Sequence, residues 1–196
     1  MRALLIHLPN LITVSRGLAG LLGAWLLLQS ADAFLEEKAV MYGLASGIVL
    51  ALAALTDWLD GWLARRLNAV TPLGALLDPI ADKVLTGSYL VAFVLISGTD
   101  PWLAAPVAII LARDIGVTGL RLAGPKRAPG AYAVTSEAKA KTALTMLLVA
   151  LPFVLVVAGL HDVGRWFYIW VGGVWLAAAL SAWSAWPYLR AALSRQ

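Results

Sequence analysis

Six long apolar runs constrain this chain more than any other feature of its sequence. They centre on about residues 11–29, 39–64, 73–97, 101–121, 142–160 and 164–189, and each is long enough to cross a bilayer as a helix. Hydrophobic residues make up 61% of the 196 residues and charged residues only 13%, which is unlike a soluble domain. We therefore expect an all-α integral membrane protein with six transmembrane helices, built as a single membrane-embedded domain over residues 1–196.

The lysines and arginines predict how these helices are oriented. Positive residues are typically retained on the cytoplasmic side of a membrane. Only Lys38 and Arg165 fall on the outer side of a six-span arrangement. The inner side collects Arg2, Arg16, Arg65, Arg66, Arg121, Lys126, Arg127, Lys139, Lys141, Arg190 and Arg195. We expect cytoplasmic N and C termini in a multi-pass protein of the cytoplasmic membrane, and this topology accounts for the net charge of +4 without a nucleic-acid partner.

The first run has a second interpretation, as a signal peptide. Residues 18–28 resemble the apolar core of such a peptide, and Ala31-Asp32-Ala33 resembles its cleavage site. The basic region before this core is thin, however, and Pro9-Asn10 precedes the run. We expect the segment to be retained as the first span.

The tryptophans are expected at the two membrane interfaces, where amphipathic rings are typically found. At the outer interface we expect Trp102, Trp166 and Trp170. At the inner interface we expect Trp183 and Trp186.

Four aspartates stand out against the apolar background. Asp57 and Asp60 are three residues apart near the end of the second run, and Asp78 and Asp82 are four apart in the third, so on helices each pair shares a face. Carboxylates near or within a bilayer are costly and indicate a functional site. Four of them meeting between two helices would repel each other without cations, and their oxygens suit Mg²⁺ or Mn²⁺. The sequence predicts a divalent-metal site at the cytosolic boundary of the membrane.

Small and basic residues beside the aspartates favour a phosphate-containing substrate. Gly61 and Ala64 leave room for a close approach to the second helix, and Arg65 can offer a planar fork to a phosphate. Two metals held by carboxylates suit displacement at phosphorus. A divalent-cation transporter is the alternative of a different class, although it predicts acidic residues near the bilayer midplane rather than at one boundary.

Four further cations predict a site for a second phosphate. Arg113 lies inside the fourth run, Arg121 ends it, and Lys139 and Lys141 open the fifth. A dianionic phosphate on the accepting substrate is a physical reason to gather them. The alternatives are an ion pair between Arg113 and Asp114, and a role for the two lysines as anchors at the leaflet surface.

The stretch 57–82 resembles the signature of the CDP-alcohol phosphotransferase family, which reads D-x2-D-G-x2-A-R-x8-G-x3-D-x3-D. All eight fixed positions are present at the right spacing, namely Asp57, Asp60, Gly61, Ala64, Arg65, Gly74, Asp78 and Asp82. The resemblance implies the six-helix membrane fold of that family, usually dimeric. It also implies transfer of a substituted phosphate from a CDP-linked donor to an alcohol, with release of CMP.

The resemblance implies a role for each signature residue. The ligands of two divalent cations, Mg²⁺ or Mn²⁺, would be Asp57, Asp60, Asp78 and Asp82. Asp82 would also be the general base that deprotonates the acceptor. The nucleotide would be bound by Asp60, Gly61, Ala64, Arg65 and Gly74.

Beyond the eight fixed positions of the signature, the chain is most similar to the phosphatidylglycerophosphate synthase branch of the family. The similar segments are Pro9–Arg16, Thr56–Gly61, Leu77–Lys83, Arg113-Asp114 with Arg121, and Lys139–Thr142. The similarity implies CDP-diacylglycerol as donor and sn-glycerol 3-phosphate as acceptor, with the active site facing the cytosol. Cardiolipin synthase and phosphatidylinositol phosphate synthase are the alternatives within the family. The acceptor stays open because Asp114 stands where glutamate is expected and Ala138 where glycine is common.

Overall fold

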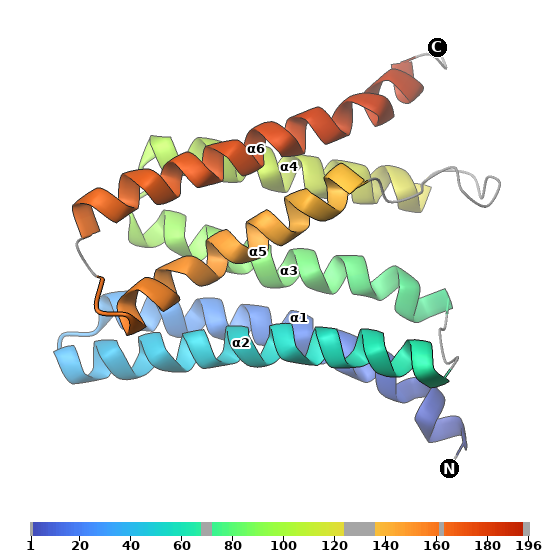
Figure 1. The fold of residues 1–196 in the computed structure, drawn as a ribbon, viewed down its shortest axis with the longest axis horizontal. Coiled ribbons are helices and arrows are strands. Elements are labelled where there is room, and N and C mark those ends of the chain that lie inside the picture. The colour runs from blue at the N-terminus through green and yellow to red at the C-terminus, as the bar shows by residue number, and fades with distance from the viewer. Residues whose placement is uncertain (1, 68–71, 124–135, 161–162, 194–196) are drawn as a thin grey trace. The chain divides into compact units, whose positions relative to one another are not determined.

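The computed structural model describes residues 2–67, 72–123, 136–160 and 163–193. Within these ranges the chain forms six helices and no strand (Figure 1). They are α1 (Arg2–Asp32), α2 (Glu36–Leu67), α3 (Pro72–Ile96), α4 (Pro101–Ala123), α5 (Ser136–Val157) and α6 (Val163–Leu193). Each contains a segment long and apolar enough to cross a membrane. The expected all-helical architecture with six spans is confirmed, and the orientation of the termini stays a prediction.

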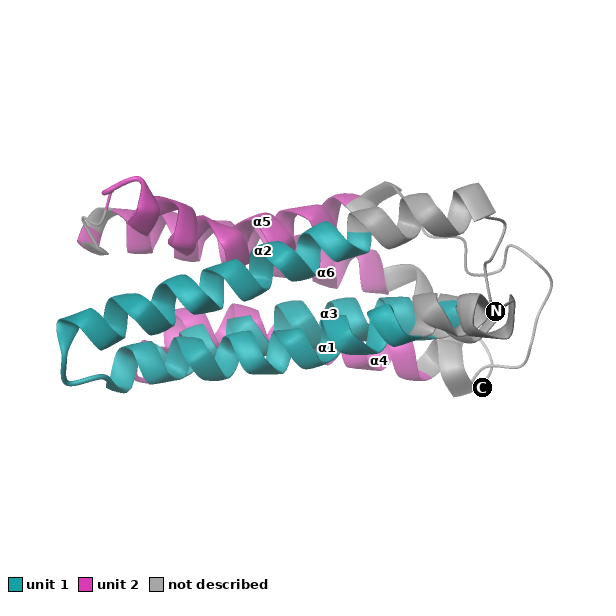
Figure 2. Cartoon of the chain, turned by 90° about the horizontal axis from the view of Figure 1, so that it is seen from below, with its two compact units in different colours: residues 1–96 teal, residues 97–196 magenta. Residues whose placement is uncertain are grey.

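The chain divides into two compact units, residues 1–96 and residues 97–196 (Figure 2). In the first unit α1 packs against both α2 and α3, and in the second unit α6 packs against both α4 and α5. Each unit is therefore a group of three helices in which one helix contacts the other two. The expectation of a single domain over residues 1–196 stays a prediction.

In the first unit, close packing of α1 on α3 requires glycine in α1. A Cβ atom at Gly20 would lie 2.5 Å from the Cα of Leu85, and one at Gly23 would overlap the hydroxyl of Tyr89. That hydroxyl donates a hydrogen bond of 2.8 Å to the carbonyl of Ser46, whose own hydroxyl donates one of 2.7 Å to the carbonyl of Gly23. Small residues and interhelical hydrogen bonds of this kind hold helices together in membranes. They bring α1, α2 and α3 into contact at one level.

In the second unit, a tryptophan compensates for a proline inside α5. Pro152 has no N–H, so the carbonyl of Leu148, four residues earlier, loses its helical partner. The indole Nε1 of Trp170 on α6 donates a hydrogen bond of 2.7 Å to that carbonyl. The side chain that packs α6 on α5 thus also satisfies the backbone group that the proline leaves open.

The same arrangement joins α4 to α6. Pro106 leaves the carbonyl of Trp102 without its helical partner, and the indole Nε1 of Trp175 donates a hydrogen bond of 2.9 Å to it. Helix α4 also has a cap at its start, because Asp100 Oδ1 accepts a hydrogen bond of 2.9 Å from the backbone N–H of Trp102. Both neighbours of α6 are therefore fastened to it through proline-freed carbonyls.

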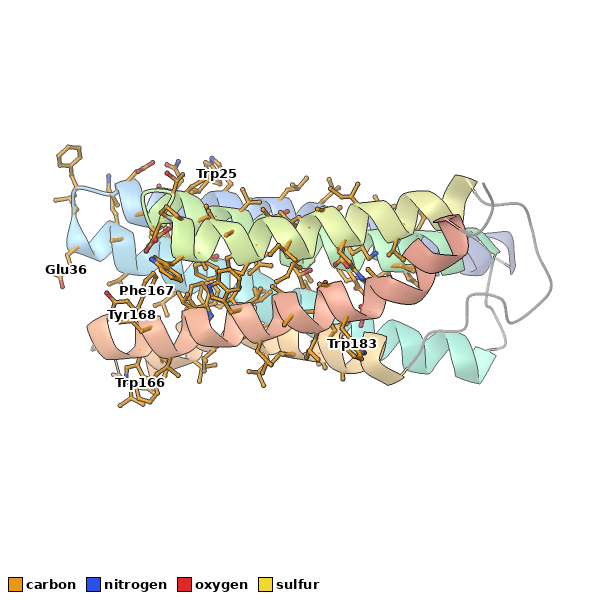
Figure 3. The ribbon with its side chains drawn as sticks, turned by 90° about the horizontal axis from the view of Figure 1, so that it is seen from above. Trp25, Glu36, Trp166, Phe167, Tyr168 and Trp183 are labelled. Carbon is orange, nitrogen blue, oxygen red and sulfur yellow. The ribbon has the colours of Figure 1, made fainter. Side chains whose placement is uncertain are left out.

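The tryptophans expected at the membrane interfaces differ in how far their side chains are exposed. Trp170 is buried, with 6% of its surface exposed, so its ring faces neighbouring helices, and its position at the outer interface stays a prediction. Its hydrogen bond to α5 explains why it turns inward. Trp166 lies near the start of α6 and Trp183 towards the other end of the helix, where Trp183 is 77% exposed (Figure 3). The side chain of Trp186 lies outside the described part of the chain.

Replacing Trp170 by phenylalanine is expected to lower the free energy of unfolding of the detergent-solubilised protein. The Leu148 carbonyl would remain buried without a donor, which costs about 1–3 kcal/mol. In a Pro152→Ala background the backbone supplies a new N–H to that carbonyl. There, Trp170→Phe should lower the free energy of unfolding by clearly less. Denaturant unfolding of the four proteins of this cycle measures the difference. Trp183→Phe is the control on the exposed face, and equal costs in both backgrounds would contradict the explanation.

Candidate metal and phosphate sites

Three aspartates of the signature surround the side chain of Arg16 in the first unit. Arg16 Nη1 contacts Asp57 Oδ1 and lies 3.4 Å from Asp82 Oδ1, and Arg16 Nη2 lies 3.2 Å from Asp78 Oδ1. Thr13, nearly one turn earlier on α1, donates a hydrogen bond of 2.7 Å to the same oxygen of Asp78. The side chain of Arg16 is 2% exposed, whereas those of the three aspartates are 33–55% exposed. One buried cation of α1 therefore meets three carboxylates of α2 and α3.

Helix geometry explains why these groups meet. Asp78 and Asp82 are one turn apart on α3 and share a face, as the sequence predicts. Gly17 of α1 lies against Ala81 of α3, where a Cβ atom added to the glycine would be 3.8 Å from the Cα of Ala81. The arginine that precedes Gly17 is thereby brought to the level of the two aspartates. A buried guanidinium requires such partners, because burial of an uncompensated charge is costly.

In the described part of the structure the carboxylates surround a guanidinium rather than a point at which they converge as metal ligands. Among the side chains that the structure describes, no three His, Cys, Asp or Glu groups are placed to hold a metal. Oxygen ligands of Mg²⁺ lie at about 2.0–2.1 Å from the ion, so they must approach one another more closely than around an arginine. The chemistry of the donors, carboxylate oxygens on two adjacent helices, nevertheless fits a hard divalent cation.

Most of the residues expected to bind the nucleotide cannot be placed. Gly74 is buried near the start of α3. The signature positions 60, 61, 64 and 65 belong to α2, but their side chains and surroundings lie outside the described part. The fourth carboxylate, that of Asp60, is among them. The roles of Asp60, Gly61, Ala64, Arg65 and Gly74 therefore stay predictions.

A second charged cluster lies in the other unit, where α6 packs against α4 and α5. Asp114 Oδ1 is 3.0 Å from Arg113 Nη1 and 2.6 Å from Lys141 Nζ, and Arg113 Nη2 donates a hydrogen bond of 2.9 Å to Ser184 Oγ. The side chains of Arg113, Asp114 and Lys141 are 9%, 13% and 3% exposed. Two cations share one carboxylate, so the buried cluster carries a net positive charge.

Two polar atoms of this region have no hydrogen-bond partner among the described residues. They are Arg113 Nε and Ser181 Oγ, and both are buried. Buried polar groups are usually satisfied, so such atoms call for an explanation. A cluster with an excess cation and an open donor has the chemistry of an anion site.

The structure bears on two of the alternatives for the four cations, the ion pair of Arg113 and the surface anchor of Lys141. Arg113 does form the ion pair with Asp114 that is the alternative to phosphate binding. Lys141 is buried, so a role as an anchor at the leaflet surface is wrong for it. The side chains of Arg121 and Lys139 lie outside the described part. Phosphate binding by these residues stays a prediction.

Arg16, Thr13 and Ser184 take part in the two clusters although the sequence alone assigns them no role there. The charge pattern places Arg16 only among the cytoplasmic positive residues. A signal is present, because Arg16 lies inside the first apolar run and a charge at such a position indicates function. Thr13 and Ser184 carry no such signal, since hydroxyl residues are common in membrane helices.

Comparisons with known proteins extend over nearly the whole chain. The family model described as CDP-alcohol phosphatidyltransferase matches residues 6–183. A CDP-diacylglycerol–glycerol-3-phosphate 3-phosphatidyltransferase of Pseudomonas fluorescens is 39% identical over 188 residues, which cover 95% of this chain and 90% of that protein. Proteins of the same name from Cereibacter sphaeroides and Bacillus subtilis are 33% and 32% identical and cover 95% and 93% of this chain. The matches cover 95% and 93% of those two proteins.

Removal of the shared carboxylate should destabilise the second unit strongly. Asp114→Asn leaves the cations of Arg113 and Lys141 buried without their counter-charge, which costs about 3–5 kcal/mol in comparable buried pairs. The melting temperature of the purified protein in detergent measures the loss. Asp32→Asn, an exposed aspartate at the end of α1, is the matched control and should change little. A variant of Asp114 as stable as the control would show that the cluster contributes no net stability.

Proposed function

We propose that this chain, which belongs to the CDP-alcohol phosphatidyltransferase family, transfers a phosphatidyl group from CDP-diacylglycerol to sn-glycerol 3-phosphate. The products are phosphatidylglycerophosphate and CMP, a step of phospholipid biosynthesis. The observation that carries the proposal is the similarity to three proteins named for this reaction, at 32–39% identity over 93–95% of the chain. The gathering of three signature carboxylates around one point of the first unit supports it. Membership of this family stands against the alternative of a cation transporter.

The four signature aspartates would hold two divalent cations, Mg²⁺ or Mn²⁺. Bound there, the metals would offset the charge of the diphosphate and of the leaving group. Carboxylate oxygens are the ligands that these ions prefer. We assign this role to Asp57, Asp60, Asp78 and Asp82, and nucleotide binding to Asp60, Gly61, Ala64, Arg65 and Gly74.

Asp82 would act as the general base. Its buried Oδ1 lies 3.4 Å from Arg16 Nη1 but accepts no hydrogen bond from the described residues, so a lone pair is left for a proton. As the hydroxyl oxygen of the acceptor forms a bond to the phosphorus that carries diacylglycerol, its proton passes to Asp82. The bond from this phosphorus to the oxygen of CMP breaks, and CMP leaves with that oxygen and its electron pair.

The buried cluster of the second unit would bind the phosphate of the acceptor. Its excess positive charge and the open Nε donor of Arg113 support this role. A phosphate oxygen is a strong acceptor for guanidinium and ammonium groups. We assign the acceptor phosphate to Arg113, Arg121, Lys139 and Lys141.

The setting of the reaction follows from the distribution of charge along the chain. We place the protein in the cytoplasmic membrane as a multi-pass homodimer, with membrane lipid around it and the active site facing the cytosol. The positive residues between the apolar runs support the orientation. Residues 1–196 would serve as one catalytic domain in each protomer.

An acceptor panel tests the proposal. The purified full-length chain in mixed micelles with CDP-diacylglycerol and Mg²⁺ should release CMP rapidly with sn-glycerol 3-phosphate. Glycerol should be a poor acceptor because it lacks the phosphate that the cations would bind. Phosphatidylglycerol and inositol phosphate test the cardiolipin synthase and phosphatidylinositol phosphate synthase alternatives. Turnover with either of these, and none with sn-glycerol 3-phosphate, would end the assignment.

Loss of the base should abolish turnover without abolishing donor binding. Asp82→Asn is expected to lower kcat by about 10²–10⁴-fold, since the amide cannot take the proton. Binding of a CDP-linked donor, measured by calorimetry, should be largely retained because three carboxylates remain. Asp32→Asn conserves the shape of the side chain and removes a charge at the end of α1, about four turns beyond Arg16, so this variant should keep full activity. Undiminished turnover in Asp82→Asn would remove this residue from the mechanism.

A further inference from the structure

We propose that Arg16 is an internal counter-cation of the carboxylate cluster, which holds Asp57, Asp78 and Asp82 together without metal and releases them when a divalent cation binds. Arg16 is thus a positioning residue whose side chain exchanges with the metal. The inference rests on the proposed role of the aspartates as metal ligands.

The first role of Arg16 is to offset the repulsion among the three carboxylates. Three carboxylates that meet from two helices repel one another, and one buried guanidinium contacts all three. Its planar fork can engage several carboxylate oxygens at once, which a lysine ammonium does less well. The carboxylates in turn compensate for the burial of the arginine. Arg16 therefore keeps the cluster assembled before any metal arrives.

The second role of Arg16 is to compete with a divalent cation for the same carboxylate oxygens. The guanidinium engages Oδ1 of each of the three aspartates. A divalent cation needs carboxylate oxygens at about 2.0–2.1 Å, and this shell leaves no room for guanidinium nitrogens between the same oxygens. The described side chains are not spaced for a metal while Arg16 stands among them. We therefore expect a metal that binds these Oδ1 atoms to displace the guanidinium.

The surroundings of Arg16 fit a side chain that moves on a fixed helix. The backbone of α1 is held by the contacts of Gly17 with Ala81 and of Gly20 with Leu85 on α3. The guanidinium is less firmly held, because its buried Nε has no hydrogen-bond partner in the described part of the chain. A permanent buried ion pair is expected to have its donors satisfied. The exchange is therefore a change of side chain and not of helix position.

Metal binding to the metal-stripped, full-length protein in detergent tests the inference. Mn²⁺ is titrated into wild type and variants, and the free ion is measured by electron paramagnetic resonance. Arg16→Gln removes the competing charge and should bind Mn²⁺ about 5–150-fold more tightly, the usual range of coupling between two ligands. Arg16→Lys keeps a cation and should stay closer to wild type. Ser15→Ala is the matched control: it removes an exposed hydroxyl of α1 that donates to the carbonyl of Ile12 on the same helix, and it should change affinity less than about twofold.

Thermal unfolding supplies a second readout. Without metal, Arg16→Gln should melt well below wild type, because the carboxylates lose their counter-charge. At saturating Mn²⁺ the difference should narrow, since the metal replaces the missing cation. A merely structural arginine would instead lower the melting temperature by the same amount under both conditions.

The outcomes separate the inference from the proposed function. If wild type binds Mn²⁺ and Arg16→Gln binds it equally or more weakly, Arg16 is no competitor and the inference fails, while the metal site stands. If Arg16→Gln remains unfolded at saturating Mn²⁺, metal does not replace the arginine and the inference fails as well. If no protein of the series binds Mn²⁺, the metal site itself is absent and both ideas fail.

Discussion

Charge compensation inside apolar surroundings is the constraint on which both units depend. In the first unit one guanidinium of α1 stands among three carboxylates, and in the second unit one carboxylate stands between two cations. Each cluster draws its members from different helices, so each ties its helices together. Neither cluster is neutral by itself, because the first has excess negative charge and the second excess positive charge. The first is suited to added cations and the second to an added anion.

The second constraint is that buried backbone carbonyls need hydrogen-bond donors, and it explains contacts between helices that involve no charged residue. Within a bilayer an unpaired carbonyl finds no water, so a carbonyl that a proline deprives of its N–H donor needs another donor from the protein. The indole N–H groups of two tryptophans of α6 are the donors for such carbonyls in α4 and α5. In the first unit, glycines of α1 allow a close approach to α3. There the carbonyls of Gly23 and Ser46 accept hydrogen bonds from hydroxyl groups of neighbouring helices. The charged residues are held in place by helices that are fastened in these different ways.

The two clusters match the two substrates of the proposed reaction. A donor with a diphosphate needs cations that carboxylates can hold, and an acceptor with its own phosphate needs fixed positive side chains. Family membership identifies the kind of chemistry, and the assignment of each cluster to one substrate is part of the proposed function. Arg16 adds a means by which the carboxylates could remain assembled between metal-binding events. Such a counter-charge offsets the repulsion among the three carboxylates that lie around it.

The sequence by itself determined the six spans, the helical class and the positions of the aspartates, because apolar run length and residue spacing are local properties of the chain. It also contained the family signature in full. Tertiary structure decided which charges compensate one another: Arg16 with three aspartates, and Asp114 with Lys141, which is 27 residues away. It also turned the indole of Trp170 towards α5, where it donates a hydrogen bond to the carbonyl of Leu148. These pairings depend on which helices pack together and at what level, and spacing along one helix does not determine that.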